Sequence, residues 1–302
     1  MKVRFSASPA AWDEWAAPLR AAIPEMVLDR DGDPASFDGI IHAPGGDISD
    51  FGPYRNVRLV QSLWAGVERI VTNATLTQPL ARMVDPGLSQ GMAEYCTGWT
   101  LRAHLDMDRY AQDGIWRNGQ VPPLAFQRPV TILGMGELGR ATARMLRALG
   151  FPVTGVSASG RTVTGVEVHP VAELDRALAQ AAILICLLPD TPATRELLDA
   201  ERLARLPQGA WIINPGRGTL INEDALLDAL GRRRPAHAVL DVFRTEPLPP
   251  DHPFWRHPAI TVTPHVAAET RPATAAPVVA ENLRRAMQGR PVLHLVDRSR
   301  GY

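Results

Sequence analysis

The chain has 302 residues, more than one hydrophobic core usually supports, so we expect two domains. Its 45% hydrophobic and 21% charged residues are ordinary for a globular protein. The 32 Lys and Arg residues balance the 32 Asp and Glu residues, so no net charge attracts nucleic acid or an anionic membrane, and neither is expected as a partner.

The two cysteines, Cys96 and Cys186, lie in apolar segments and have neither metal-ligand nor redox spacing. We expect both to be buried in a reducing compartment, and no metal site. No run approaches the roughly 18 apolar residues of a membrane span, and the N-terminus lacks the apolar core of a signal peptide. The sequence therefore predicts a cytoplasmic protein.

The first third of the chain predicts a small α/β unit, a candidate substrate domain. Its expected elements are a helix at Ala10–Ala22 and strands at Lys2–Ser6, Met26–Leu28, Gly39–His42 and Arg58–Leu63. The loop Trp64-Ala65-Gly66-Val67 follows the last of these strands. Small residues there allow backbone N–H groups to point at an anion such as a carboxylate, although an ordinary turn explains them equally well.

A long apolar-periodic stretch then predicts a helix at Gln90–Asp113 that bridges the first unit to the next. The proline-punctuated segment Gly114–Arg128 follows it. Two readings remain open for this segment, an oligomerisation arm and a plain surface loop.

A glycine-rich turn between a strand and a helix follows this segment. Val130–Leu133 predicts a buried strand, and the sequence Gly134-Met135-Gly136-Glu137-Leu138-Gly139 has G-x-G-x-x-G spacing before a helical run at Arg140–Leu149. The first glycine permits the turn, the second lets backbone approach a pyrophosphate, and the third lets helix and strand pack closely. The stretch predicts a dinucleotide site.

The end of the next strand, Pro152–Val156, bears on the choice of cofactor. NAD-binding units place an acid there for the ribose hydroxyls, whereas an arginine suits the 2′-phosphate of NADP. This chain has Ser157-Ala158-Ser159-Gly160-Arg161, with no acid. We therefore expect NADP(H) in preference to NAD(H). In the alternative reading, Arg161 is simply solvated.

Four later strands each end in polar or special residues, and in an open parallel sheet such ends face one crevice. They are expected at Ala182–Leu188, Ala210–Ile213, Ala238–Leu240 and Ile260–Thr263. Arg217, Glu246 and His265 follow three of them. Arginine can bind a keto acid in a forked geometry, and a histidine oriented by a carboxylate can exchange a proton with a carbonyl substrate. The three side chains supply the groups needed for hydride-transfer chemistry.

In four motifs the chain resembles the D-isomer-specific 2-hydroxyacid dehydrogenases: GMGELG at 134–139, NPGRG at 214–218, LDVFRTEP at 240–247 and TPHV at 263–266. Within that family, WAGV at 64–67, GMAEY at 91–95, EPLP at 246–249 and VDRSRGY at 296–302 resemble the glyoxylate/hydroxypyruvate reductase A branch.

The resemblance implies an α/β fold with two Rossmann-like, doubly wound parallel-sheet domains and a cleft between them. Residues 1–92 with 272–302 would form the substrate domain and residues 93–271 the dinucleotide-binding domain. Pairing through the bridging helix and arm would give a homodimer. Ala158 departs from the family, because many members of the branch carry a basic residue there.

The resemblance also implies roles for individual residues. Arg217 would orient the substrate, His265 would be the acid/base and Glu246 its partner, with Trp64, Ala65, Gly66 and Val67 at the substrate carboxylate. Asp241 would contact the nicotinamide carboxamide. The other residues expected at the cofactor are Gly134, Met135, Gly136, Glu137, Leu138, Gly139, Ser157, Ser159, Arg161, Leu188, Pro189, Thr194 and Pro215.

The predicted function is NADPH-dependent reduction of small 2-keto acids, namely glyoxylate to glycolate and hydroxypyruvate to glycerate. One alternative keeps the chemistry but changes the substrate to a bulkier 2-keto acid or the cofactor to NAD. Another is a non-catalytic, nucleotide-sensing binding protein. Retention of Arg217, Glu246 and His265 together argues against the sensor, which needs none of them.

Overall fold

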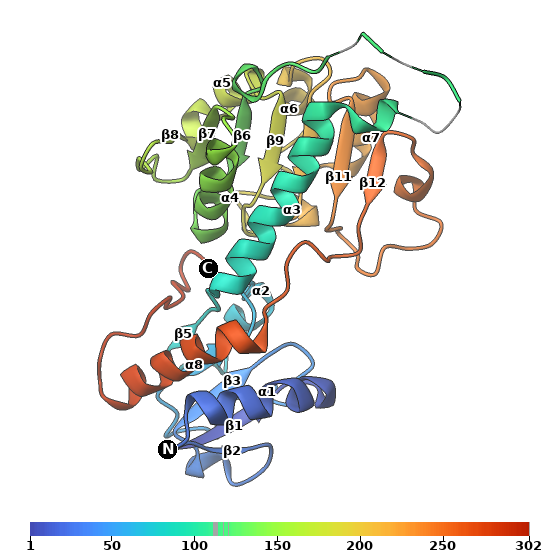
Figure 1. The fold of residues 1–302 in the computed structure, drawn as a ribbon. Helices are drawn as coiled ribbons and strands as arrows, with labels where there is room; N and C mark the ends of the chain where they lie inside the picture. Colours follow the sequence, from blue (N-terminus) through green and yellow to red (C-terminus); the bar gives the residue numbers. More distant parts are fainter. Residues whose placement is uncertain (111–113, 117, 120, 302) are drawn as a thin grey trace. The chain divides into compact units, whose positions relative to one another are not determined.

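The computed structural model describes residues 1–110, 114–116, 118–119 and 121–301. The chain forms two compact units (Figure 1). The first unit contains residues 1–88 and 270–302, and the second unit contains residues 89–269. The sequence-based boundaries differ from these by a few residues at each junction.

The first unit is built on a five-stranded sheet of order β2-β1-β3-β4-β5, in which every pair of neighbours is parallel. Its helices α1 and α8 pack against each other. The elements are β1 (Lys2–Ser6), α1 (Pro9–Ala22), β2 (Val27–Asp29), β3 (Gly39–His42), β4 (Val60–Ser62), α2 (Glu68–Val71), β5 (Leu80–Ala81) and α8 (Pro272–Met287).

The second unit has a seven-stranded, fully parallel sheet of order β12-β11-β10-β9-β6-β7-β8. Its strands are β6 (Val130–Leu133), β7 (Val153–Ser157), β8 (Glu167–Pro170), β9 (Ile183–Cys186), β10 (Trp211–Asn214), β11 (His237–Leu240) and β12 (Ile260–Val262). Its helices are α3 (Pro86–Leu105), which begins just before the unit boundary, α4 (Glu137–Ala148), α5 (Leu174–Ala179), α6 (Ala200–Arg205) and α7 (Glu223–Gly231).

Successive side chains along the central strands of the second unit point to opposite faces of the sheet, and both faces are buried. In β9, Ile183 and Ile185 enter a core shared with α3 and α4, whereas Leu184 and Cys186 enter a core shared with α5, α6 and α7. Helices on both faces explain why these strands are continuous apolar runs. The predicted fold class, two doubly wound parallel-sheet units, is confirmed. Both cysteines are buried.

Both sheets reverse their strand order at one point, where such folds bind ligands. In the second unit the reversal lies between β6 and β9. The glycine turn begins at the carboxyl end of β6, so this sheet order places the predicted dinucleotide motif at the reversal. In the first unit the reversal lies between β1 and β3.

The predicted bridging helix is wrong at both ends. The helix α3 begins at Pro86, where both carboxylate oxygens of Asp85 accept backbone N–H groups of its first turn, and it ends at Leu105. Asp106 then adopts a left-handed conformation with φ of 50°, which stops the helix. Part of the remaining prediction, residues 111–113, lies outside the described residues, as do residues 117 and 120 of the expected arm.

None of the described helices is both long enough and apolar enough to cross a membrane. Among the same residues, no group of three or more His, Cys, Asp and Glu side chains is placed to hold a metal ion.

The strand β11 carries a half-buried histidine that makes folding depend on pH. His237 stacks on Trp211 at a centroid distance of 4.2 Å, and its Nε2 lies 2.9 Å from the hydroxyl of Thr261. Desolvation by burial lowers the pKa of His237 from 6.5 to about 4. Between these values the unfolded chain binds the proton better than the folded one, so acid favours unfolding.

We therefore expect His237→Gln to weaken the pH dependence of stability between pH 6.5 and 4. Urea denaturation across this interval measures it. In the wild-type protein the midpoint should fall as the pH falls, and the variant should lose part of that slope. An unchanged slope in the variant would show that His237 titrates alike in the folded and unfolded states.

Candidate active site

The glycine turn has the backbone geometry that a dinucleotide requires. Gly134 has φ of 102°, and a Cβ atom there would lie 2.5 Å from the carbonyl oxygen of Leu187. A Cβ at Gly139 would lie 1.9 Å from the carbonyl oxygen of Gly134, so α4 and β6 pack too closely for any side chain. At Gly136, the N-cap of α4, a Cβ would meet nothing within 4 Å. The turn is therefore open where a pyrophosphate would approach the helix N-terminus, and its residues fit the cofactor.

The other predicted residues of this turn differ in exposure. Met135 is buried and lies against Gly155 of the neighbouring strand β7. Glu137 is exposed and pairs with Arg140 one turn later at 3.6 Å. Leu138 is half-buried. Of the three, Met135 serves the packing of the turn.

The loop after β9 is held by one hydroxyl group. Oγ1 of Thr194 donates to the carbonyl oxygen of Pro189 at 2.6 Å and accepts the backbone N–H of Thr191 at 2.9 Å. Leu188 and Pro189, both half-buried, precede this loop. Thr194 therefore fixes the backbone of residues 189–194.

The end of β7 forms a tight, polar turn. The backbone N–H of Gly160 donates to the carbonyl oxygen of Ser157 at 3.3 Å, and that of Arg161 donates to Oγ of Ser159 at 3.3 Å. Ser159 and Arg161 are exposed. The described turn contains a hydroxyl and a guanidinium group and no carboxylate.

The loop that carries Arg217 is held by a buried asparagine. Oδ1 of Asn214 accepts the backbone N–H of Gly216 at 3.2 Å, and its Nδ2 donates to the carbonyl oxygen of Arg217 at 3.0 Å. Pro215 is buried, and Arg217 is half-buried. The NPGRG motif contains Asn214, to which we assigned no role from the sequence, although an asparagine just before a glycine turn is a signal of such a bonded loop.

The loops of Arg217 and Glu246 touch at a glycine. A Cβ atom at Gly218 would lie 2.1 Å from the carbonyl carbon of Phe243 and 2.5 Å from the backbone nitrogen of Arg244. Only a residue without a side chain fits between these two segments of backbone. The contact brings the loop after β10 against the loop after β11.

Glu246 and His265 form a hydrogen-bonded pair. Oε1 of Glu246 accepts the backbone N–H of Phe243 at 2.9 Å, and its Oε2 lies 2.8 Å from Nδ1 of His265. The carboxylate is thus fixed by its own loop at one oxygen and orients the imidazole with the other. The His265 side chain is 56% exposed, so it is open to a ligand.

Asp241, at the end of β11, organises the backbone around His265. His265 has φ of 54°, and its N–H donates to the carbonyl oxygen of Asp241 at 2.9 Å. The Asp241 carboxylate accepts the next two backbone amides, Val266 at 3.0 Å and Ala267 at 2.9 Å, and the hydroxyl of Thr263 at 2.5 Å. The carboxylate expected at the nicotinamide therefore already accepts hydrogen bonds from residues 263–267, which we call the histidine loop.

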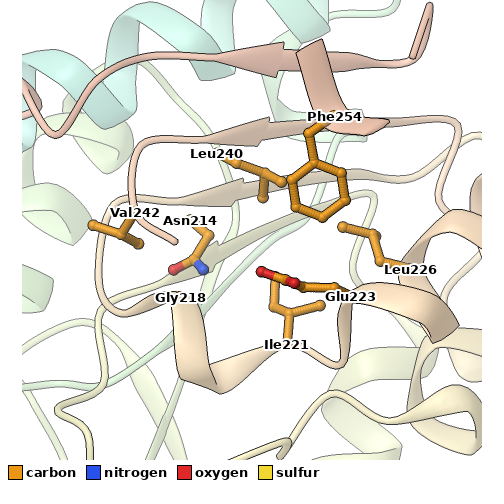
Figure 2. Close-up of a pocket in the computed structure, with 8 residues that line it drawn as sticks. All are labelled: Asn214, Gly218, Ile221, Glu223, Leu226, Leu240, Val242 and Phe254. Atoms are coloured by element: carbon orange, nitrogen blue, oxygen red, sulfur yellow. The ribbon is translucent and has the colours of Figure 1, made fainter. Parts of the chain in front are cut away.

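A small pocket lies beneath these loops (Figure 2). Apolar side chains form most of its wall, and none of Arg217, Glu246 and His265 lines it. Its lining residues are Asn214, Gly218, Ile221, Glu223, Leu226, Leu240, Val242 and Phe254. Gly218 and Val242 belong to the loops after β10 and β11, so the pocket lies in the support of these two loops.

The loop that is expected to bind the substrate carboxylate lies in the first unit, after β4. Trp64 is 51% exposed, and its backbone is anchored by Ser62 and by the N–H of Met83. Val67 is buried as the N-cap of α2, and Ala65 and Gly66 are partly exposed. The loop is therefore anchored at Trp64, and its tip is partly exposed.

Known proteins match this chain over its whole length. The family model described as "D-isomer specific 2-hydroxyacid dehydrogenase, NAD binding domain" matches residues 99–267. The chain belongs to the D-isomer specific 2-hydroxyacid dehydrogenase family. It is thus an NAD(P)-dependent dehydrogenase by family, and the second unit contains the part that the family model describes as NAD binding.

Solved structures of 2-hydroxyacid dehydrogenases resemble the chain closely. One from Xanthobacter autotrophicus Py2, in complex with NADPH and MES, is 37% identical with a TM-score of 0.93, covering 100% of this chain and 99% of its own. The NADPH-dependent glyoxylate/hydroxypyruvate reductase of Sinorhizobium meliloti, with NADP and sulfate, is 33% identical with a TM-score of 0.88 and the same coverage. The likeness extends over both units.

Proposed function

We propose that this dehydrogenase reduces small 2-keto acids with NADPH, and that glyoxylate and hydroxypyruvate are its substrates. The pair of His265 and Glu246, 2.8 Å apart, is the observation that carries the proposal. Bonding at Nδ1 leaves the other ring nitrogen, Nε2, as the proton donor for a carbonyl oxygen. The similarity to the Sinorhizobium meliloti reductase supports the choice of substrates.

The proposed reaction divides the work among three side chains. Arg217 binds the keto acid through its planar guanidinium group and polarises the carbonyl. When bound, the reduced nicotinamide supplies the hydride that adds to the carbonyl carbon. His265 gives its proton to the carbonyl oxygen as negative charge develops there, and Glu246 stabilises the imidazole through this step. In the first unit, the backbone at Ala65–Val67 is proposed to hold the substrate carboxylate.

The cofactor is proposed to sit on the glycine turn, with its 2′-phosphate at the turn after β7. Exposed Ser159 and Arg161 supply a hydroxyl and a positive charge, and no carboxylate repels the phosphate there. Complexes of two similar dehydrogenases with NADPH or NADP support this choice. Asp241 is proposed to accept a hydrogen bond from the N–H of the nicotinamide carboxamide at a remaining lone pair of its carboxylate.

Removal of the Arg161 side chain is expected to weaken NADPH binding selectively. A charge-assisted bond to a phosphate contributes about 1.5–3 kcal/mol, so Arg161→Ala should raise the Kd for NADPH by about 10-fold or more. The Kd for NADH should change little. Fluorescence titration with both nucleotides measures this, with Arg176→Ala, an exposed arginine on α5, as a control. Equal weakening for both cofactors would place the 2′-phosphate elsewhere.

The decisive experiment follows the loss of reduced-nicotinamide absorbance at roughly neutral pH. The purified protein is given NADPH or NADH with glyoxylate, hydroxypyruvate, pyruvate and a bulky 2-keto acid. Fast oxidation of NADPH by the two proposed substrates is expected. Preference for the bulky acid would change the substrate class, and tight cofactor binding without any turnover would favour the nucleotide-sensing alternative.

We also propose that the protein is a homodimer that pairs through the bridging helix and the arm at 114–128. The described part of this segment exposes several large apolar side chains, among them Trp116 at 89% and Val121 at 90%. Such surface is seldom left in water. Sedimentation velocity should give a dimer that Trp116→Glu weakens, and a monomeric wild-type protein would contradict the proposal.

A further inference from the structure

A chain of hydroxyl groups connects the helix α3 to the histidine loop. Oη of Tyr95 lies 2.7 Å from Oγ1 of Thr263, which lies 2.5 Å from Oδ1 of Asp241. The first bond of this network joins Tyr95 of α3 to Thr263, which lies 168 positions later in the sequence. All three lie within the second unit.

The donor and acceptor in each of these two hydrogen bonds follow from the chemistry of the Asp241 carboxylate. A carboxylate only accepts hydrogen bonds, so the single proton of the Thr263 hydroxyl points to Asp241. The Tyr95 hydroxyl is then the donor to Thr263. Burial raises the pKa of Tyr95, which keeps this donor protonated.

Asp241 is in turn hydrogen-bonded to the backbone at and after His265. Its carbonyl oxygen accepts the N–H of His265, and its carboxylate accepts the next two backbone amides, so three consecutive amides are bound to one residue. A non-glycine residue at positive φ costs of order 1–3 kcal/mol and persists only where its surroundings hold it. The Asp241 side chain is fully buried, and its orientation depends on the bonds that it accepts.

We propose that Tyr95 and Thr263 are positioning residues that hold Asp241, and through it the backbone of His265, in the reactive arrangement. This inference rests on the proposed function, in which His265 donates the proton. Loss of either hydroxyl leaves Asp241 with fewer donors, so the carboxylate turns or shifts and the loop at 263–267 loosens. The imidazole then leaves its alignment with Glu246.

Three variants separate positioning from mere stability. Tyr95→Phe and Thr263→Val remove the two hydroxyl groups at nearly constant volume, whereas Thr263→Ser keeps the second. A misplacement of about 1 Å can cost up to 100-fold in rate, so the first two should lower kcat about 10-fold or more while the Kd for NADPH stays within about 2-fold. Thr263→Ser should recover most of the rate. Tyr54→Phe, which changes a buried tyrosine of the first unit, is the matched control.

A second readout does not depend on turnover. Diethyl pyrocarbonate modifies imidazoles, and peptide mapping by mass spectrometry gives the rate at His265 alone. Tyr95→Phe and Thr263→Val should change this rate several-fold relative to wild type and to Tyr54→Phe. If the wild-type protein reduces no keto acid, the proposed function fails while this readout still tests the positioning.

The outcomes are distinct. Reduced kcat with an altered modification rate at His265, both restored in Thr263→Ser, supports the proposal. A kcat and a modification rate that both stay at the wild-type value in Tyr95→Phe and Thr263→Val would overturn it. A lower melting temperature without either change also overturns it, because the hydroxyl groups would then serve stability alone.

Discussion

Replacement of His265 by asparagine is expected to lower kcat for keto-acid reduction by about 10²- to 10⁴-fold, the usual contribution of a general acid. The variant loses the proposed proton donor, which is bonded to Glu246, while the glycine turn is untouched. Cofactor affinity should therefore stay within about 2-fold of the wild-type value. Stopped-flow turnover with NADPH and glyoxylate, together with fluorescence titration of NADPH, measures both quantities.

Asparagine suits this position because of the backbone. His265 has φ of 54°, a conformation that asparagine adopts more readily than most residues, so the loop should survive the change. His257→Asn is a control, since it makes the same change at the end of the 3-10 helix Pro253–Arg256, before β12 begins, whereas His265 follows the end of β12. Full activity in His265→Asn would assign the proton transfer to another group.

Replacement of Gly218 by alanine should separate the loop that carries Arg217 from the loop that carries Glu246. The added carbon would lie 2.1 Å from the Phe243 carbonyl carbon and 2.4 Å from its Cα, and both are backbone atoms that cannot rotate away. Overpacking typically costs 1–3 kcal/mol and sometimes more, so we expect a loss of stability of about that size. Because Arg217 and Glu246 move apart, kcat should fall by roughly 100-fold.

The chain provides a matched control for this change. Gly231 ends α7 in the same unit, and a Cβ there would meet nothing within 4 Å. Gly231→Ala should be neutral or stabilise the protein by up to about 1 kcal/mol, because alanine favours helix. Thermal denaturation and initial rates compare the two variants. If Gly218→Ala behaves like Gly231→Ala, the contact between the loops is not required.

Buried apolar runs made most of the fold predictable. The strand Val130–Leu133 is found where it was expected, because apolar side chains fill both faces of a covered parallel sheet. The strand Lys2–Ser6 was predictable instead because apolar Val3 and Phe5 alternate with polar residues. The edge strand β8, Glu167–Pro170, was not expected, since its side chains are largely outside the core and show no apolar pattern. The end of α3 also escaped prediction, because Asp106 stops it without a glycine or proline.

The site was predictable where local motifs define it and not where distant residues meet. Strand ends and motif spacing led to Arg217, Glu246 and His265, and the structure joins Glu246 to His265 by a hydrogen bond. The hydroxyl of Tyr95 could not be connected to Thr263 from the sequence, because a pattern in a helix does not show which strand end it reaches. The pairing of Gly218 with Phe243 depends likewise on the approach of two loops.

The division of the chain into units bears on the order of events during synthesis. The second unit is one uninterrupted stretch, 89–269, whereas the first unit needs α8, Pro272–Met287, whose Ala275, Val279 and Leu283 complete the core over β1 and β3. A growing chain on the ribosome therefore exposes apolar surface of its first sheet until α8 has been synthesised. The second unit is translated after residues 1–88 but before α8, so it can fold before the first unit is complete.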